Sequence, residues 1–148
     1  AFNLYDKDKR VYTRARILPT SKISNTELNN AVIAEGCIIH ASKIEKSVIG
    51  VRSRIGENST VVNTYMMGSD LYESLDQIEK NHIEILLGIG ENCYIKNAII
   101  DKNCRIGDNV RINEGDQILE DTETDHYVIK DGIVVIKKDA VIPSGTII

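Results

Sequence analysis

The sequence contains no tryptophan and only one phenylalanine, whereas isoleucine and valine are abundant. It also lacks a sustained apolar spacing of three and four residues, which is the pattern that a helical bundle requires. A narrow interior of constant width suits β-branched side chains and leaves little room for large rings. The composition therefore argues against a helical protein and favours a repetitive β structure.

Cysteine is also scarce: Cys37, Cys93 and Cys104 form no Cys-x-x-Cys pair, and any pairing leaves one thiol over. This pattern suits a reducing compartment, the cytoplasm or a plastid stroma, and argues against a disulfide framework. The net charge of −4 argues against a general nucleic-acid or membrane-surface role. No run of about 18 apolar residues marks a membrane span, and the first residues do not have the pattern of a signal peptide. We expect no nucleic-acid or membrane partner.

Motifs of self-contained catalysis are missing from the chain. It has no glycine-rich phosphate loop, no His-Glu-x-x-His and no Gly-x-Ser-x-Gly. His40, His82 and His126 stand 42 and 44 residues apart, so three separate segments would have to meet at one metal ion. We expect no metal site and no catalytic residue in this chain.

What the sequence does contain is a repeat of six residues. One aliphatic residue recurs at this period, with occasional slips of one residue. The repeated anchors are Val32, Ile38 and Ile44; Ile49, Ile55, Val61 and Met67; Ile89 and Ile95; Ile100, Ile106, Ile112 and Ile118; and Ile136, Ile142 and Ile148. The residues that follow three of the anchors are also alike, with Ile-Gly-Glu-Asn from Ile55 and from Ile89, and Ile-Gly-Asp-Asn from Ile106.

Each six-residue unit fits one short strand and one corner of a triangular coil. One aliphatic side chain per unit points inward, and Gly or Asn at the corner tolerates the positive φ of a tight turn. Successive coils stack about 4.8 Å apart through backbone hydrogen bonds, so that like residues lie on like residues. We predict an all-β fold, a left-handed parallel β-helix of hexapeptide repeats.

Two interruptions and one irregular end complete the predicted organisation. Residues 68–88 lack anchors and predict an excursion loop or short helix outside the coils. Residues 127–135 predict a β-hairpin with an Asp-Gly turn at Asp131-Gly132, standing off the prism. Residues 1–22 resemble a linker from an upstream domain, and residues 23–148 form the predicted β-helix.

Four segments carry a family resemblance: Tyr12–Lys22, Ser47–Ser53, Ile99–Asn109 and Gly132–Ile148. They resemble the C-terminal domain of ADP-glucose pyrophosphorylase (glucose-1-phosphate adenylyltransferase), of the cyanobacterial and plant small-subunit type. Members join glucose 1-phosphate to ATP and release pyrophosphate and ADP-glucose, the committed step toward glycogen or starch. An N-terminal nucleotidyltransferase domain that requires Mg²⁺ does this chemistry, so the resemblance implies that the present chain is inactive alone.

For the C-terminal domain, the resemblance implies regulation and assembly. Family members are tetramers that 3-phosphoglycerate activates and orthophosphate inhibits, with effectors bound where the two domains meet. The activator lysines correspond to Lys102 and Lys138, and Asp101 and Arg16 are further candidates for the same cleft. Of the doubled Lys137-Lys138 we choose Lys138, because it directly precedes Asp-Ala-Val-Ile-Pro. Spacing alone shows only solvated charges at these positions.

Two other functions remain open from the residues. Many hexapeptide-repeat proteins are acyltransferases that use a histidine as general base, and His40 is the candidate here, although a surface imidazole at a coil corner is the favoured interpretation of this residue. The chain could also be a purely structural prism that spaces catalytic domains and binds no ligand. The irregular coils and the linker-like start count against a free-standing acyltransferase.

Overall fold

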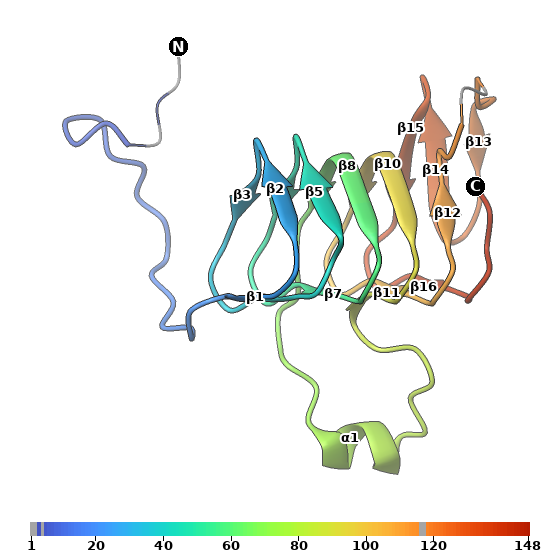
Figure 1. Cartoon of the computed structure of the whole chain (residues 1–148), viewed down its shortest axis with the longest axis horizontal. Coiled ribbons are helices and arrows are strands. Elements are labelled where there is room, and N and C mark those ends of the chain that lie inside the picture. Colours follow the sequence, from blue (N-terminus) through green and yellow to red (C-terminus); the bar gives the residue numbers. More distant parts are fainter. Residues whose placement is uncertain (1–2, 4, 116–117) are drawn as a thin grey trace.

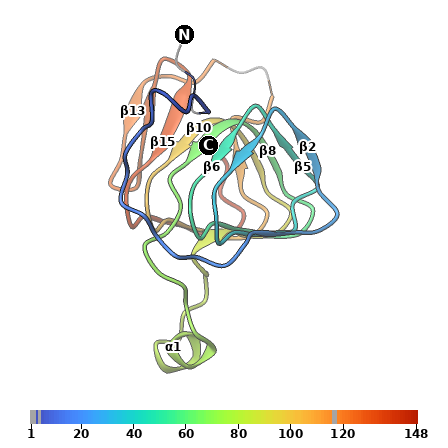
Figure 2. The same cartoon turned by 90° about the vertical axis from the view of Figure 1, so that its left-hand side faces the viewer.

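The computed structural model describes residue 3, residues 5–115 and residues 118–148. Most of the chain winds into a three-faced prism of stacked coils (Figures 1 and 2). The first face is a six-stranded parallel sheet, made of β1 (Lys22–Ile23), β4 (Ile38–Ile39), β7 (Arg54–Ile55), β9 (Gly88–Ile89), β11 (Arg105–Ile106) and β16 (Val141–Ile142).

The other two faces share long strands that run over the corner between them. The second face contains β2 (Glu27–Asn29), β5 (Lys43–Glu45), the first part of β8 (Thr60–Met66), the first part of β10 (Tyr94–Ile100) and β12 (Arg111–Ile112). The third face contains β3 (Val32–Ile33), β6 (Val48–Ile49), the ends of β8 and β10, and β15 (Ile133–Ile136). All of these pairings between coils are parallel, as the repeat predicts.

The core consists of three inward-facing aliphatic columns, one for each face. In every strand pair of the first face the second residue stacks on its equivalent, which gives the column Ile23, Ile39, Ile55, Ile89, Ile106, Ile142. The second and third faces contribute the columns Leu28, Ile44, Val61, Ile95, Ile112 and Ile33, Ile49, Met66, Ile100, Ile136. Away from the first coil these side chains are almost fully buried, so burial of branched aliphatic groups is the main stabilising term of the prism.

Four predicted anchors are wrong. Val32, Ile38 and Met67 are 47%, 44% and 38% exposed, and the residue beside each of them, Ile33, Ile39 or Met66, faces the interior instead. The step from the second face to the third is five residues rather than six, because one left-handed residue makes that corner. This residue is Asn30, Lys46, Asn63, Asn97 or Asn113 in successive coils, with φ between 46° and 58°. This shortened corner moves the inward position from Met67 to Met66. The step from Ile39 on the first face to Ile44 on the second is also five residues, which moves the inward positions before Ile44 from Ile38 and Val32 to Ile39 and Ile33.

The fourth wrong anchor is Ile118, which is 95% exposed. The chain leaves the coil after Ile112 and returns to the third face only at β15. The core position above Ile100 is therefore filled by Ile136. A regular repeat would have filled this position with a residue much earlier in the chain. Ile118 thus continues the sequence repeat without occupying a core position.

The predicted hairpin is confirmed, with one difference. Strand β14 (Tyr127–Lys130) pairs antiparallel with β15, and Asp131 and Gly132 between them have φ values of 49° and 76°. Positive φ at both central residues is the type I′ geometry that Asp-Gly favours. The hairpin does not stand wholly off the prism, because β15 pairs with β10 and belongs to the third face, while β14 and β13 (Thr122–Glu123) extend that sheet beyond the coils.

The excursion between β8 and β9 is also confirmed. It carries α1 (Leu75–Lys80), a short helix that stands out from the wall of the prism in both views (Figures 1 and 2). Ser74 caps the helix by accepting a hydrogen bond from the amide of Gln77, whose side chain accepts one from the Ser74 amide. This capping box satisfies amide groups that the short helix cannot pair internally.

The observed register predicts that alanine substitutions at two neighbouring isoleucines lower the free energy of unfolding by different amounts. We expect Ile39→Ala, at a fully buried position, to lower the free energy of unfolding by about 2–5 kcal/mol, because it leaves a cavity in the first-face column. We expect Ile38→Ala, on the outer surface of the same strand, to cost less than about 1 kcal/mol. Urea unfolding of the two variants measures the difference. Equal costs would contradict the observed register.

Candidate functional site

One edge of the prism, between the third and first faces, carries the predicted lysines. Three successive coils turn here through Gly68–Asp70, Asp101–Asn103 and Lys137–Asp139, which we name the lysine corner. Backbone hydrogen bonds stack the three turns, from the Asn103 amide to the Gly68 carbonyl at 3.1 Å and from the Asp139 amide to the Lys102 carbonyl at 2.9 Å. Continuing the pairing of Ile100 with Ile136 by two residues places Lys102 opposite Lys138.

Lys102 does not project freely from this corner. Its Nζ lies 2.8 Å from Oδ1 of Asp70, and the other oxygen of Asp70 accepts a hydrogen bond from the Asn103 side chain at 3.1 Å. The Asp70 amide in turn donates to Asn103 Oδ1. Lys102, Asn103 and, more weakly, Lys138 stabilise the ionised carboxylate and hold the pKa of Asp70 below its usual value. Sequence analysis missed Asp70, because nothing in the repeat links it to a residue 32 positions later.

The two adjacent lysines have different surroundings. Lys137 Nζ donates to the Thr124 carbonyl at 2.6 Å and pairs with Glu123 at 3.1 Å, so it fastens the segment around β13 to the prism. Lys138 is exposed, and within the described residues no ion pair involves it. An anion arriving from solvent therefore meets the ammonium group of Lys138 without having to displace a protein carboxylate.

The other two predicted residues differ in position. Asp101 belongs to the lysine corner, where its carboxylate accepts a hydrogen bond from the Lys102 amide at 2.6 Å and shapes the turn. Arg16 is exposed and lies in the N-terminal segment, which runs past β1 and β3 at the other end of the prism from β15 (Figure 1). The described chain thus brings Asp101, Lys102 and Lys138 together, but it does not bring Arg16 to them.

Groups for self-contained chemistry do not assemble elsewhere in residues 3, 5–115 and 118–148. This part of the chain holds no cluster of three His, Cys, Asp or Glu residues that could bind a metal ion. The three cysteines are buried and free, and desolvation raises the pKa of Cys104 to about 12. Such thiols remain protonated at neutral pH and are poor nucleophiles. His40 is half-buried at a corner after β4.

Comparison with known proteins identifies this architecture. The family model of the GLGC left-handed parallel β-helix domain matches residues 16–147. The chain belongs to this family. The match confirms the predicted left-handed β-helix, because it includes every coil and both interruptions. Together with the relative described next, it confirms the predicted family.

A curated relative supports the same assignment. The small subunit of glucose-1-phosphate adenylyltransferase from Triticum aestivum, described as chloroplastic/amyloplastic, is 49% identical over 152 residues. The alignment covers 99% of the present chain and 32% of the wheat protein. The chain therefore spans about a third of the length of this relative. No helix in the described part of the GLGC-family chain is long and apolar enough to cross a membrane.

The lysine corner predicts a measurable titration. We expect NMR titration of the side-chain carboxyl carbons to give Asp70 a pKa below that of an unperturbed aspartate, because Lys102 and Asn103 stabilise its charged form. Since the folded pKa is lowered, the stability contributed by this contact is complete above the unfolded pKa and is lost as the pH falls through the folded value. Lys102→Gln should raise the pKa of Asp70, whereas Lys80→Gln in α1 should not. An unchanged pKa in Lys102→Gln would contradict the ion pair.

Proposed function

We propose that this chain is the regulatory and assembly domain of an ADP-glucose pyrophosphorylase. The complete enzyme would join ATP to glucose 1-phosphate and release ADP-glucose and pyrophosphate, in glycogen or starch synthesis. The support comes from membership of the GLGC β-helix family and from the wheat small subunit, a glucose-1-phosphate adenylyltransferase. The observation that carries the regulatory part is the stacking of Lys102 and Lys138 at one corner.

In this proposal 3-phosphoglycerate activates the enzyme and orthophosphate inhibits it, both through the lysine corner. Two ammonium groups on adjacent coils suit a phosphate or carboxylate group, since charge-assisted hydrogen bonds are stronger than neutral ones. Lys138 would be the first contact because it has no ion-pair partner among the described residues. Lys102 would have to exchange the Asp70 carboxylate for the effector, and the Asp70–Lys102 pair would therefore compete with effector binding.

Regulation then requires a second state of the whole enzyme. The prism is held rigid by its coil-to-coil hydrogen bonds, so an effector is not expected to refold it. We infer that the anion draws the lysine corner toward the catalytic domain, because it makes different contacts in the two interdomain arrangements. A coupling of about 1–3 kcal/mol is typical of such systems and lies within the range of a few charge-assisted hydrogen bonds.

The remaining parts of the enzyme would lie outside this chain. The partners would be an N-terminal catalytic domain and further subunits of a homotetramer or heterotetramer, in the cytoplasm or a plastid stroma. Residues 1–22 would be the linker to the catalytic domain, and Arg16 would contribute to the effector site only through the position of that linker. Mg²⁺ would be bound by the catalytic domain, since no cluster of metal ligands is present in the described part of the chain.

The two alternative functions, an acyltransferase and a structural spacer, are supported to different degrees. A free-standing acyltransferase has little support, because the wheat relative is an adenylyltransferase and the family match places the chain in a different group of β-helix proteins. Acetyl transfer from acetyl-CoA that is lost in His40→Ala would nevertheless favour it. A spacer that binds no effector shares the family and the fold with our proposal. Only the response of the lysines to effectors separates the two.

The proposal predicts how lysine substitutions change activation. In a full-length subunit with this chain as its C-terminal third, we expect Lys138→Ala and Lys102→Ala to raise the 3-phosphoglycerate concentration for half-maximal activation by about tenfold, the effect of losing about 1.4 kcal/mol of coupling. Activity without effector should change little, because neither residue belongs to the catalytic domain. Synthesis of ADP-glucose at several effector concentrations measures both quantities.

Lys137→Ala is the matched control, since it removes the same charge from the adjacent position but breaks contacts to Thr124 and Glu123 instead. We expect it to leave activation nearly unchanged. Normal activation in both Lys102→Ala and Lys138→Ala would show that the prism is only a spacer.

A further inference from the structure

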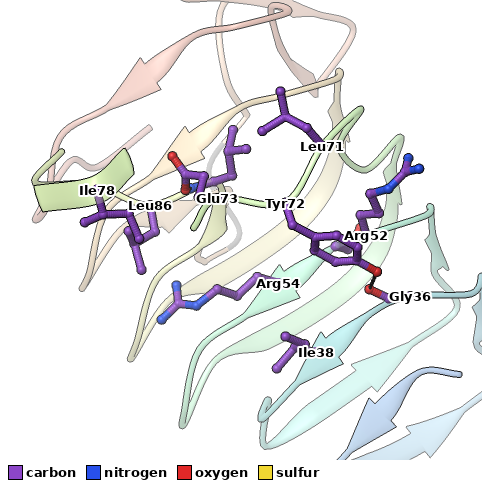
Figure 3. Close-up of a pocket in the computed structure, with 11 residues that line it drawn as sticks. Gly36, Ile38, Arg52, Arg54, Leu71, Tyr72, Glu73, Ile78 and Leu86 are labelled. Atoms are coloured by element: carbon purple, nitrogen blue, oxygen red, sulfur yellow. Dashed lines mark hydrogen bonds between the residues drawn. The ribbon is translucent and has the colours of Figure 1, made fainter. Parts of the chain in front are cut away.

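We propose that a pocket beneath the excursion loop binds a small monocarboxylate with a compact apolar body. The pocket has a volume of about 220 Å³ and lies between the first-face side of the prism and residues 71–87. Its lining includes Ile38, Arg54, Leu71, Tyr72 and Leu86 (Figure 3). None of its lining residues belongs to the lysine corner, and the inference does not depend on the regulatory proposal.

Polar contacts on both sides fasten the loop to the prism and fix the walls of the pocket. On one side the Tyr72 hydroxyl donates to the Gly36 carbonyl at 2.8 Å, drawn as a dashed line in Figure 3. On the other side Glu73 forms an ion pair with Arg105 at 2.6 Å and accepts a hydrogen bond from the Leu87 amide at 2.8 Å. A pocket fixed in this way requires little ordering of the protein when a ligand binds.

Gly36 shows how closely the Tyr72 contact fits. A Cβ atom at this position would lie 2.3 Å from the Tyr72 hydroxyl, and the residue has φ of +78°, which non-glycine residues rarely adopt. The excursion loop therefore rests on a backbone position that only glycine fills without displacing the tyrosine. This contact fixes the position of Tyr72, which forms one wall of the pocket.

The charge in the pocket comes from Arg54. Its side chain extends between Ile38 and Leu86 (Figure 3), and no ion pair of the described residues involves it. Arg52 turns the other way, with its guanidinium carbon 5.8 Å from the centre of the Tyr72 ring and one Nη donating to the Ser69 carbonyl. The carboxylate of Glu73 is compensated by Arg105. Neither Arg52 nor Arg54 has a carboxylate partner among the described residues, but Arg52 is held by Tyr72 and Ser69, so the guanidinium group of Arg54 is the one available to a ligand. Arg54 also lines a neighbouring cavity together with Glu84 and Asp108.

The walls decide which anion this guanidinium suits. Ile38, Leu71 and Tyr72 remain substantially exposed at the pocket, so a ligand with an apolar body would remove apolar surface from water. A guanidinium group binds one carboxylate in a planar, bidentate manner. A phosphate dianion would lose more hydration in these surroundings than a single cation restores. The pocket is also smaller than the roughly 300–1,000 Å³ of drug-sized ligand sites, which limits the body to a single small ring or branched chain.

Benzoate is a suitable probe, with benzamide as its neutral analogue and inorganic phosphate as the anion without an apolar body. We expect benzoate to shift the backbone amide signals of Leu71, Leu86 and Leu87 in a saturable manner in two-dimensional ¹H–¹⁵N NMR spectra of the chain. Benzamide and phosphate should not saturate these shifts in the same concentration range. Arg54→Gln should weaken benzoate binding by about tenfold or more, as expected for the loss of a charge-assisted hydrogen bond.

Lys22→Gln is the matched control, because Lys22 lies in the same outward column as Arg54, two coils earlier, and its loss changes the net charge equally. It should leave benzoate binding unchanged, and so should Lys138→Ala, which tests the regulatory proposal separately. Three results would overturn the assignment: no saturable shift with benzoate, equal binding of benzamide, or unweakened binding by an Arg54→Gln variant with wild-type amide spectra elsewhere.

Discussion

The register between coils is the constraint on which this structure depends. Each coil satisfies its backbone groups with the next one, so residues at equivalent positions become neighbours whatever their separation in the sequence. This rule stacks Ile39 on Ile55 in the core. It also brings Lys138 beside Lys102 at the surface, 36 positions away along the chain (138 − 102). The core and the candidate effector site therefore have the same physical cause, and a register error would destroy both.

The repeat predicts the architecture because a prism of constant width requires similar residues at regular intervals in the sequence. Inward positions need branched aliphatic residues, and corners need residues that accept positive φ, which here are mostly asparagine and glycine. The three register errors share one explanation. Val32, Ile38 and Met67 each adjoin an equally apolar residue, so hydrophobicity alone cannot choose between the two. A five-residue step decides in each case, from Ile39 to Ile44 for the first two residues and at the corner between the second and third faces for Met67. The left-handed residue of that corner can be asparagine or, as at Lys46, a residue with no turn signature.

The sequence predicts less of the candidate site than of the fold. Stacking of the two lysines follows once the coils are aligned, and the family resemblance pointed to them directly. The Asp70 carboxylate has no such signal, because it lies where the regular coil ends and the excursion begins. The same holds for Glu73 and Arg105, whose ion pair joins the excursion to β11. Contacts between an excursion and the prism depend on how the loop folds back, and a repeat carries no information about that path.

The excursion links the two candidate sites through a very short piece of chain. Asp70 is bound at the lysine corner, Leu71 and Tyr72 line the pocket, and Glu73 is anchored to the prism. An effector that took Lys102 from Asp70 would release one end of this segment while Glu73 held the other. The change would then be absorbed at Leu71 and Tyr72, the wall of the pocket. Occupancy of either site would alter the other by the same factor, because coupling between two binding equilibria is reciprocal. In this proposal the rigid prism would confine the response to the loop, where four consecutive residues, 70–73, connect both surfaces.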